Sequence, residues 1–272
     1  MTRTQPEERD MAGSIQDVRV ALVTGGRRGI GRASAFALAD NGFDVLINDL
    51  EHDEAAEETV QGIKDRGRRA SFIQADVADL GQHERLVREA QCFGPLSCLL
   101  NNAGVQTRHR GDILETPPES FDRLMSINLR ASFFLTQRVA RQMRDDDRGD
   151  RTRPTRSVIF ISSGNAVIAT AAQAEYCISK AGVAMMSTLY ALRLAEYGIA
   201  VHEVRPGIIQ TDMTKDVFEK YNGWVEAGGF PMARWGQAED VGNTVAQLAS
   251  GRMPYSTGQA FFVDGGMHIR RT

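Results

Sequence analysis

The feature that most constrains the fold is a regular alternation between short, β-branched apolar runs and longer segments with helical periodicity. Runs of this kind are typical of buried strands in a parallel sheet, and the helical segments between them supply the crossover connections. The pattern predicts strands at 18–24, 43–49, 70–75, 98–101, 157–162, 199–205 and 260–263. It predicts helices at 30–41, 54–66, 80–91, 119–144, 174–197 and 238–250. We therefore expect a single α/β domain built on a Rossmann-type, doubly wound parallel sheet.

Composition argues against several classes of function. The 272 residues carry a net charge of -3, whereas a nucleic-acid surface usually needs a clustered excess of Lys and Arg. No uncharged apolar run approaches the length of about 18 residues that a membrane helix needs. The three cysteines and five histidines lack metal-ligand spacing, so we expect no metal site and expect the histidines at the surface. Three cysteines also form no disulfide framework, which favours a reducing compartment, and we expect the protein in the cytoplasm.

Three segments outside the regular pattern carry expectations of their own. Residues 1–17 are rich in charge and poor in apolar periodicity, which predicts a disordered extension before a domain at 18–272. The charged stretch 145–156 predicts a solvated surface loop. Residues 211–235 carry aromatic side chains between glycines, which favours a lid over an apolar substrate, although a packed helical hairpin would have a similar sequence.

A glycine-rich turn, TGGRRGIG at 24–31, falls where the first predicted strand ends and the first helix begins. Glycines there let the backbone turn tightly and approach a pyrophosphate, which the amides and the positive end of the helix dipole then hold. The spacing is Gly-x3-Gly-x-Gly and departs from GxGxxG, so the turn alone is weak evidence. The residues expected to contact a dinucleotide here are Gly25, Arg27, Arg28, Gly29, Ile30 and Gly31.

The next strand ends add polar and small residues that fit the same cofactor. Asp49 ends the second strand, where a carboxylate accepts hydrogen bonds from the adenosine ribose and repels a 2′-phosphate, which favours NAD. Arg28 could instead pair with that phosphate, so NADP is the alternative. The contacts expected after the third and fourth strands are Asp76, Val77, Asn102, Ala103 and Gly104. Ligands of open parallel sheets lie across the carboxyl ends of the strands, so these positions reinforce one another.

The chemical centre is predicted at YCISK, residues 176–180. Helix positions i and i+4 share a face, so the phenol of Tyr176 and the ammonium of Lys180 can point into one cleft. A tyrosine with the ordinary pKa of about 10 is a poor acid or base at neutral pH, and a neighbouring cation lowers that pKa. Ser163 can orient a carbonyl oxygen, and Asn128 is a polar residue within an apolar stretch. A solvated helix face and a structural asparagine are the alternative interpretations.

Taken together, these motifs resemble the short-chain dehydrogenase/reductase family over roughly residues 18–267. The match includes TGGRRGIG, NNAG, YCISK, the Pro-Gly pair followed by a threonine, and the terminal Val-Asp-Gly-Gly. The resemblance implies a nicotinamide-dependent oxidoreductase in which Tyr176 is the general acid in carbonyl reduction and the general base in alcohol oxidation. Lys180 would bind the nicotinamide ribose and lower the tyrosine pKa.

The resemblance assigns further roles. Ser163 would polarise the substrate oxygen, and Asn128 would hold a water molecule that links Lys180 to solvent. The nicotinamide and pyrophosphate end would be shaped by Pro206, Gly207, Ile209 and Thr211. The family commonly forms tetramers through its two long helices, here 119–144 and 174–197, so we expect a homotetramer.

Within the family the chain is most similar to the 3-oxoacyl-acyl-carrier-protein reductase group, through RGIGRA, NNAG, SINLRASFF and ARWGQAEDVG. The expected substrate is a small carbonyl or alcohol, with a thioester-linked one as first candidate. Two positions depart from that group: Asp49 points to NAD, and Tyr197 stands where a basic carrier-docking residue is often found. The alternatives are an NAD-dependent dehydrogenase of a small alcohol, polyol or sugar, and a non-enzymatic dinucleotide sensor.

Overall fold

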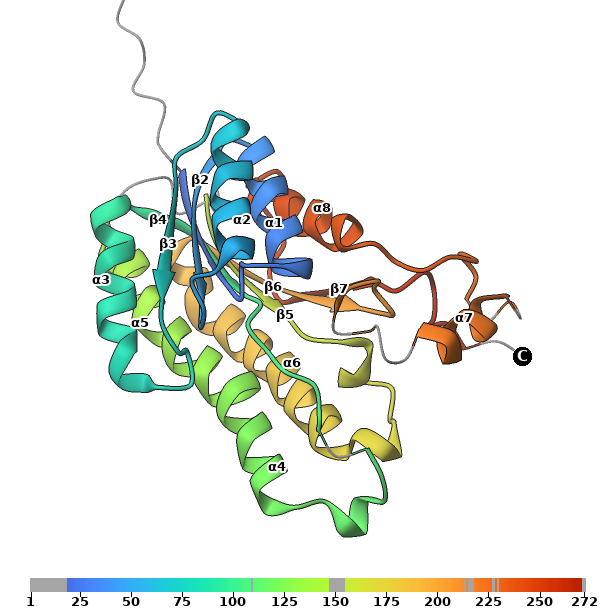
Figure 1. The fold of residues 1–272 in the computed structure, drawn as a ribbon. Helices are drawn as coiled ribbons and strands as arrows, with labels where there is room; N and C mark the ends of the chain where they lie inside the picture. The colour runs from blue at the N-terminus through green and yellow to red at the C-terminus, as the bar shows by residue number, and fades with distance from the viewer. Residues whose placement is uncertain are drawn as a thin grey trace, which may run out of the picture.

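The structure is a computed structural model that describes residues 19–108, 110–146, 155–212, 214, 218–226, 228 and 230–270. Within these ranges one parallel sheet has the strand order β3-β2-β1-β4-β5-β6-β7 (Figure 1). Its strands are β1 (Arg19–Thr24), β2 (Phe43–Asp49), β3 (Ala70–Gln74), β4 (Leu96–Asn101), β5 (Arg156–Ile161), β6 (Ile199–Pro206) and β7 (Gln259–Val263). The strand order reverses between β1 and β4, which is the switch point of a doubly wound fold. The predicted fold class is confirmed, and the chain forms a single domain.

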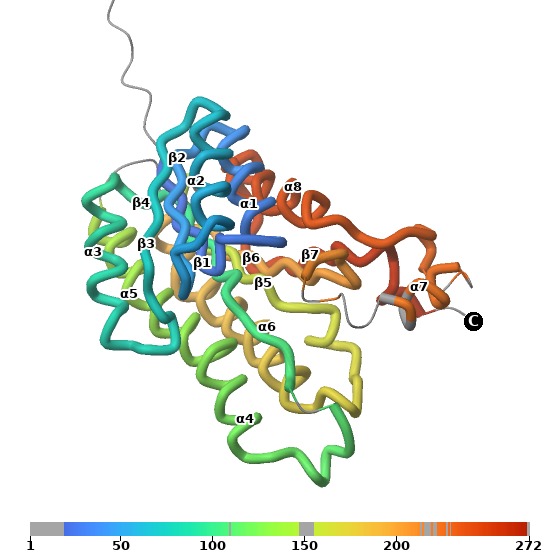
Figure 2. Tube along the Cα trace, in the orientation of Figure 1, coloured from blue at the N-terminus to red at the C-terminus, as the bar shows by residue number. Residues whose placement is uncertain are grey.

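Helices cover both faces of the sheet (Figures 1 and 2). Those on one face are α1 (Gly29–Asp40), α2 (Glu54–Asp65) and α8 (Ala238–Ala249). Those on the other are α3 (His83–Phe93), α5 (Ser132–Asp145) and α6 (Ala174–Leu194). The shorter elements are η1 (Leu80–Gln82), η2 (Ile113–Glu115), α4 (Pro118–Leu124), η3 (Met125–Ala131), η4 (Gly164–Ala166), η5 (Ala171–Gln173), η6 (Ala195–Tyr197) and α7 (Phe218–Glu226). None of the helices in the described ranges is long and apolar enough to cross a membrane.

The core lies in two layers because strand side chains alternate between the two faces of the sheet. In β1, Val20 and Leu22 face the α3, α5 and α6 layer, while Ala21 and Val23 face the α1, α2 and α8 layer. All four side chains are fully buried. Burial of each valine or leucine contributes about 1.5–3 kcal/mol, so β1 is held at the centre of the sheet from both sides.

The helix predicted at 119–144 is present, but it is not a regular α-helix along its whole length. The π-helical segment η3 separates α4 from α5 in the middle of that stretch. Here the side chain of Ser132 bonds to the backbone carbonyls of Asn128 and Leu129, at 3.0 and 3.1 Å. Hydroxyls that bond back to carbonyls compete with the regular helical ladder, and π-helical turns are frequent at functional sites. The irregular turn carries Asn128, one of the predicted site residues.

Two of the histidines expected at the surface are buried. The Nε2 atom of His83 lies 2.7 Å from the backbone oxygen of Val77, and His202 packs edge-on against Phe261 with ring centres 5.7 Å apart. Burial lowers the pKa of His202 to about 4, because a low-dielectric environment disfavours the charged imidazolium. Both rings are therefore neutral parts of the core. His109 lies outside the described residues.

The segment predicted as a lid, 211–235, contains α7. Around it, Val225, Phe230 and Trp235 form a small buried cluster against Ile208 and Met267. Figures 1 and 2 accordingly show α7 beside the C-terminal end of the described chain. The lid itself stays a prediction. The predicted extension at 1–17, and most of the loop at 145–156, lie outside the described residues.

Candidate active site

The carboxyl ends of the strands open into one cleft with a volume of about 430 Å³. Segments that follow β1 to β6 line it, so the chain delivers side chains from six strand ends to one place. Of the predicted catalytic residues, the lining includes Ser163, Tyr176 and Lys180. Of the predicted cofactor residues, it includes Gly25, Arg27, Arg28, Gly29, Ile30, Gly31, Asp49, Asp76, Val77, Asn102, Ala103, Gly104, Pro206, Gly207, Ile209 and Thr211. Asn128 is the one predicted site residue that does not line the cleft.

The glycine-rich turn is built for a close backbone approach. Gly25 has a positive φ of 63°, and a Cβ on Gly31 would lie 2.0 Å from the Gly25 oxygen. The Nδ2 atom of Asn102 donates to the backbone oxygens of Thr24 and Gly25, both at 2.9 Å, which ties the end of β1 to the loop after β4. No side chain caps the N-terminus of α1, and its first turn holds no acidic residue. The amides of that turn are therefore suited to a phosphate.

At the end of the cleft next to β2, three carboxylates surround Arg27. The backbone amide of Arg27 donates to Asp49 at 3.3 Å, and its Nη1 atom lies 2.6 Å from Glu51 and also contacts Asp53. The Arg27 side chain is only 12% exposed. Arg28, by contrast, is 59% exposed and its guanidinium lies 3.6 Å from Asp212. The guanidinium of Arg27 is thus already paired with carboxylates, and the contact of Asp49 with the adenosine ribose stays a prediction.

The tyrosine and the lysine meet on the buried face of α6. The Nζ atom of Lys180 donates to the Ile161 backbone oxygen at 3.1 Å and lies 5.6 Å from the centre of the Tyr176 ring. Burial raises the pKa of Tyr176 to about 12, although hydrogen bonding to Ser163 and the charge of Arg110 act in the opposite direction. This differs from the lowered tyrosine pKa that the sequence predicted. Burial also lowers the pKa of Lys180 to about 8.

Ser163 faces the tyrosine from the end of β5. Its hydroxyl oxygen accepts a hydrogen bond from the Asn165 amide at 3.1 Å, where it caps η4. Its hydroxyl also donates to Asn165 Oδ1 in a long contact of 3.5 Å, and hydrogen bonding between Ser163 and Tyr176 is one of the influences on the tyrosine pKa. Asn165 therefore holds Ser163 in place beside Tyr176, and the 3.5 Å donor contact is long enough for a substrate oxygen to replace it.

Asn128 lies outside the cleft lining and connects the loop after β4 to α6 through hydrogen bonds. Its Oδ1 atom accepts from the Val105 amide at 2.8 Å, and its Nδ2 atom donates to the Val105 oxygen at 3.0 Å and to Ser179 at 3.1 Å. A Cβ on Gly104 would lie 3.3 Å from Asn128 Oδ1 and 3.5 Å from Lys180 Nζ. Asn128 and Lys180 thus approach each other across a glycine, and the predicted water between them stays a prediction.

Sequence reasoning missed four polar residues near Tyr176, which are Gln106, Arg110, Asn165 and Gln173. Gln173 stands three residues before Tyr176, a spacing that could have placed it on the same side of the helix start. It also missed Glu175, a buried carboxylate that accepts hydrogen bonds from Thr107 and from Ser120, the latter at 2.9 Å.

Within the described ranges, no cluster of three or more His, Cys, Asp or Glu side chains is arranged to hold a metal.

Comparisons with known proteins agree with this geometry. The sequence model of the family described as Enoyl-(Acyl carrier protein) reductase matches residues 25–268. The 3-oxoacyl-acyl-carrier-protein reductase FabG of Staphylococcus aureus is 36% identical over 250 residues, which cover 92% of this chain and 98% of that protein.

Two solved structures extend the comparison. The 3-oxoacyl-acyl-carrier-protein reductase of Brucella melitensis in complex with NAD has a TM-score of 0.89 and 45% identity, covering 94% of this chain and 99% of that one. A gluconate 5-dehydrogenase of Burkholderia cenocepacia in complex with NADP and tartrate has a TM-score of 0.83 and 31% identity, covering 92% and 95%. Both hold a nicotinamide dinucleotide, and the uncapped α1 turn suits its phosphates. The chain belongs to the short-chain dehydrogenase/reductase family and is an NAD(P)-dependent oxidoreductase.

Proposed function

We propose that the chain interconverts a ketone and a secondary alcohol, with Tyr176 exchanging the proton. The observation that carries the proposal is the convergence of Ser163, Tyr176 and Lys180 in one cleft together with the glycine-rich turn. The nicotinamide supplies or accepts the hydride when the cofactor is bound. In the reductive direction Tyr176 gives its proton to the substrate oxygen, and in the oxidative direction it accepts the hydroxyl proton. Ser163 donates to that oxygen and orients it.

The first substrate candidate is a 3-oxoacyl thioester. Its support is similarity: relatives with this activity in their names match over almost the whole chain, at 36% and 45% identity. Turnover of acetoacetyl thioesters with NADH tests the candidate directly. Activity that rises with acyl length or with a pantetheine arm supports it, and activity confined to free alcohols, polyols or sugars contradicts it.

A second candidate is a small polar alcohol, polyol or sugar. The observation in its favour is the set of polar groups that line the cleft together with Tyr176, which can bind the hydroxyls of a polar substrate. These groups belong to Gln106, Arg110, Asn165 and Gln173. The gluconate 5-dehydrogenase neighbour works on a substrate of this kind by its name. A non-enzymatic dinucleotide sensor remains the outcome if cofactor binds and neither substrate class is turned over.

We propose NAD as the preferred cofactor. A 2′-phosphate on the adenosine ribose would approach Asp49 and its neighbours Glu51 and Asp53, and like charges at short range repel. Arg27 cannot offset that repulsion, because the same carboxylates already hold its guanidinium. Arg28 is the other cation of the glycine-rich turn that lines the cleft, and it lies beside Asp212. NADP stays the alternative, with Arg28 as its phosphate partner.

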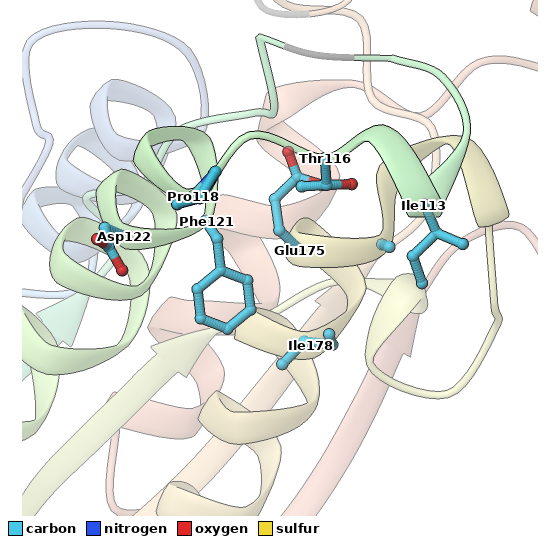
Figure 3. Close-up of a pocket in the computed structure, with 8 residues that line it drawn as sticks. Ile113, Thr116, Pro118, Phe121, Asp122, Glu175 and Ile178 are labelled. Atoms are coloured by element: carbon cyan, nitrogen blue, oxygen red, sulfur yellow. The ribbon is translucent and has the colours of Figure 1, made fainter.

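We propose that the protein is a homotetramer that works in the cytoplasm. Exposed apolar side chains follow α4 and α6, among them Phe121, Ile178, Leu189 and Leu192. Figure 3 shows Phe121 of α4 and Ile178 of α6 at one hollow between the two helices. Apolar surface that neighbours one long helix is typical of an interface between copies. A monomeric mass by light scattering would contradict the tetramer.

A further inference from the structure

Arg110 is a cation in the cleft that has no role in the proposed proton transfer. Arg110 lines the cleft together with Gln106, Gln173 and Tyr176 and is exposed to solvent. Among the described residues, no carboxylate forms an ion pair with it. The carboxylates that line the cleft lie elsewhere: Asp49 ends β2, Asp76 comes after β3, and Asp212 is next to Arg28. The end of the cleft at Tyr176 is therefore positively charged.

The loop that leads to Arg110 is anchored at Val105 and at Thr107. Val105 is bonded through its amide and its carbonyl to Asn128, and Thr107 donates to the buried carboxylate of Glu175. Glu175 is the residue before Tyr176 on α6, so the loop and the tyrosine are fastened to the same turn of helix. These contacts hold the chain that leads to Arg110 against the catalytic helix.

The guanidinium itself is oriented by a buried amide. With its oxygen turned toward Arg110, the Gln173 side chain lies 3.2 Å from Nη2 and also contacts Nη1. Gln173 is only 7% exposed, so its amide is a fixed acceptor. A guanidinium has five N–H donors. The Gln173 oxygen accepts from one donor on Nη1 and one on Nη2, and the other three N–H groups are left for a ligand. The planar fork that remains matches a carboxylate in two-point geometry.

Arg110 is close enough to act on the reacting group. Burial dominates the Tyr176 pKa and raises it, and the positive charge of Arg110 is one of the influences that oppose this rise. The guanidinium also contacts Gln173, three residues before Tyr176 in the chain, so a group bound to Arg110 would lie near an oxygen bound to Tyr176. The phosphate of a pantetheine arm is separated from its acyl carbonyl by a long chain and does not fit that spacing.

We propose that Arg110, oriented by Gln173, binds a carboxylate on the substrate close to the reacting carbon, so that the preferred substrate is a small oxo acid or hydroxy acid. The inference rests on the proposed ketone–alcohol chemistry and narrows its second substrate candidate, the small polar molecules, to those that carry a carboxylate. Arg110 then determines specificity by pairing with a charge that a neutral ketone lacks, while Tyr176 and Ser163 act on the ketone oxygen in either case.

A matched pair of ketones tests the assignment. Acetoacetate and methyl acetoacetate carry the same reacting ketone and differ in the charge of the carboxyl group. In Arg110→Gln we expect kcat/KM for acetoacetate to fall about 10- to 100-fold, the usual effect of losing a hydrogen bond between charged groups, with little change for the ester. Arg110→Lys should recover part of the loss. Arg108→Gln is the control, because Arg108 is exposed and does not line the cleft.

The alternative results overturn the proposal in different ways. An equal loss on acid and ester would assign Arg110 a general positioning role. A loss confined to a phosphopantetheine thioester, and absent for the phosphate-free N-acetylcysteamine thioester and for acetoacetate, would assign the anion to the phosphate. An unchanged preference between acid and ester in Arg110→Gln would remove the residue from substrate recognition.

A binding measurement separates this proposal from the proposed activity. In the Tyr176→Phe background the chemistry is removed, and calorimetric titration of acetoacetate in the presence of NADH reports the subsite alone. We expect the added Arg110→Gln change to weaken acetoacetate binding at least about tenfold. Undiminished binding would overturn the subsite. If wild-type protein turned over no ketone while this titration still showed the loss, the proposed activity would fail and the anion subsite would stand.

Discussion

The Nζ atom of Lys180 lies 5.6 Å from the centre of the Tyr176 ring, one helical turn along the buried face of α6. The distance places the ammonium beside the phenol without a direct hydrogen bond between them. The ammonium instead donates a hydrogen bond to the Ile161 backbone oxygen, and burial lowers the pKa of Lys180 to about 8. A charge that titrates so near neutrality makes cofactor binding sensitive to pH.

NADH affinity should be constant below about pH 8 and weaken above it. The folded-state pKa of Lys180 is about 8, so the ammonium that we expect to hold the nicotinamide ribose is lost as the pH rises through that value. The weakening can reach at most about tenfold per pH unit. Fluorescence titration between pH 6 and pH 9.5 measures it. Lys180→Met is the control: its binding should be weaker and nearly independent of pH, and an undiminished pH dependence would assign the effect to another group.

Asp49→Ala should raise tolerance of NADPH relative to NADH by about tenfold or more, because it removes one charge that repels a 2′-phosphate. Arg28→Ala should leave the NADH affinity nearly unchanged and reduce whatever NADPH binding exists. The ratio of the two dissociation constants, measured side by side, is the readout. If Asp49→Ala leaves that ratio unchanged, the discrimination lies in Arg28 or in the backbone of the turn.

His202 should make the fold sensitive to acid. The imidazole has a folded-state pKa of about 4, below the ordinary value of 6.5, so the unfolded chain binds more protons between these pH values. The free energy of unfolding is therefore unaffected by His202 above pH 6.5 and falls as the pH decreases from 6.5 to 4. Urea unfolding at a series of pH values measures the slope. In His202→Leu part of the slope should disappear, and an identical slope would show that His202 is not its source.

Asn128→Ala should destabilise the fold as well as the site. The change leaves the amide and carbonyl of Val105 without their side-chain partner, and an unsatisfied buried group costs about 1–3 kcal/mol. Thermal unfolding of the variant should show a lower Tm. NADH binding should weaken in parallel, because the Val105 contact holds the loop that contains Gly104. A normal Tm with lost turnover would favour the water-holding role over the bracing role.

The fold and the cofactor end of the site were predictable from the sequence because their determinants are local. Apolar periodicity depends on the pattern within one segment, and the sheet order brings every strand end to one edge. For that reason residues as distant in sequence as Gly25, Asp76 and Thr211 line the same cleft. The Tyr176–Lys180 pair is likewise set by the period of one helix.

The parts that sequence reasoning missed depend on contacts between distant segments. The π-helical turn at Asn128 forms where that side chain reaches Val105, and neither residue predicts the contact by itself. Arg27 belongs to the predicted glycine turn, but its ion pairs with Glu51 and Asp53 come from the loop after β2. Arg110 lies in a charged loop without periodicity, and only the fold shows that the loop ends beside Tyr176.

The central claim is that Tyr176 exchanges the proton while other residues bind the cofactor, and Tyr176→Phe tests it most directly. The measurement pairs NADH titration with turnover of acetoacetate, its methyl ester and acetoacetyl thioesters, in wild-type protein and in the variant. The account predicts NADH affinity within about twofold of wild type and a loss of turnover of about 10²–10⁴-fold, the usual contribution of a positioned acid or base. Retained turnover in Tyr176→Phe on a substrate that the wild-type protein reduces would contradict it.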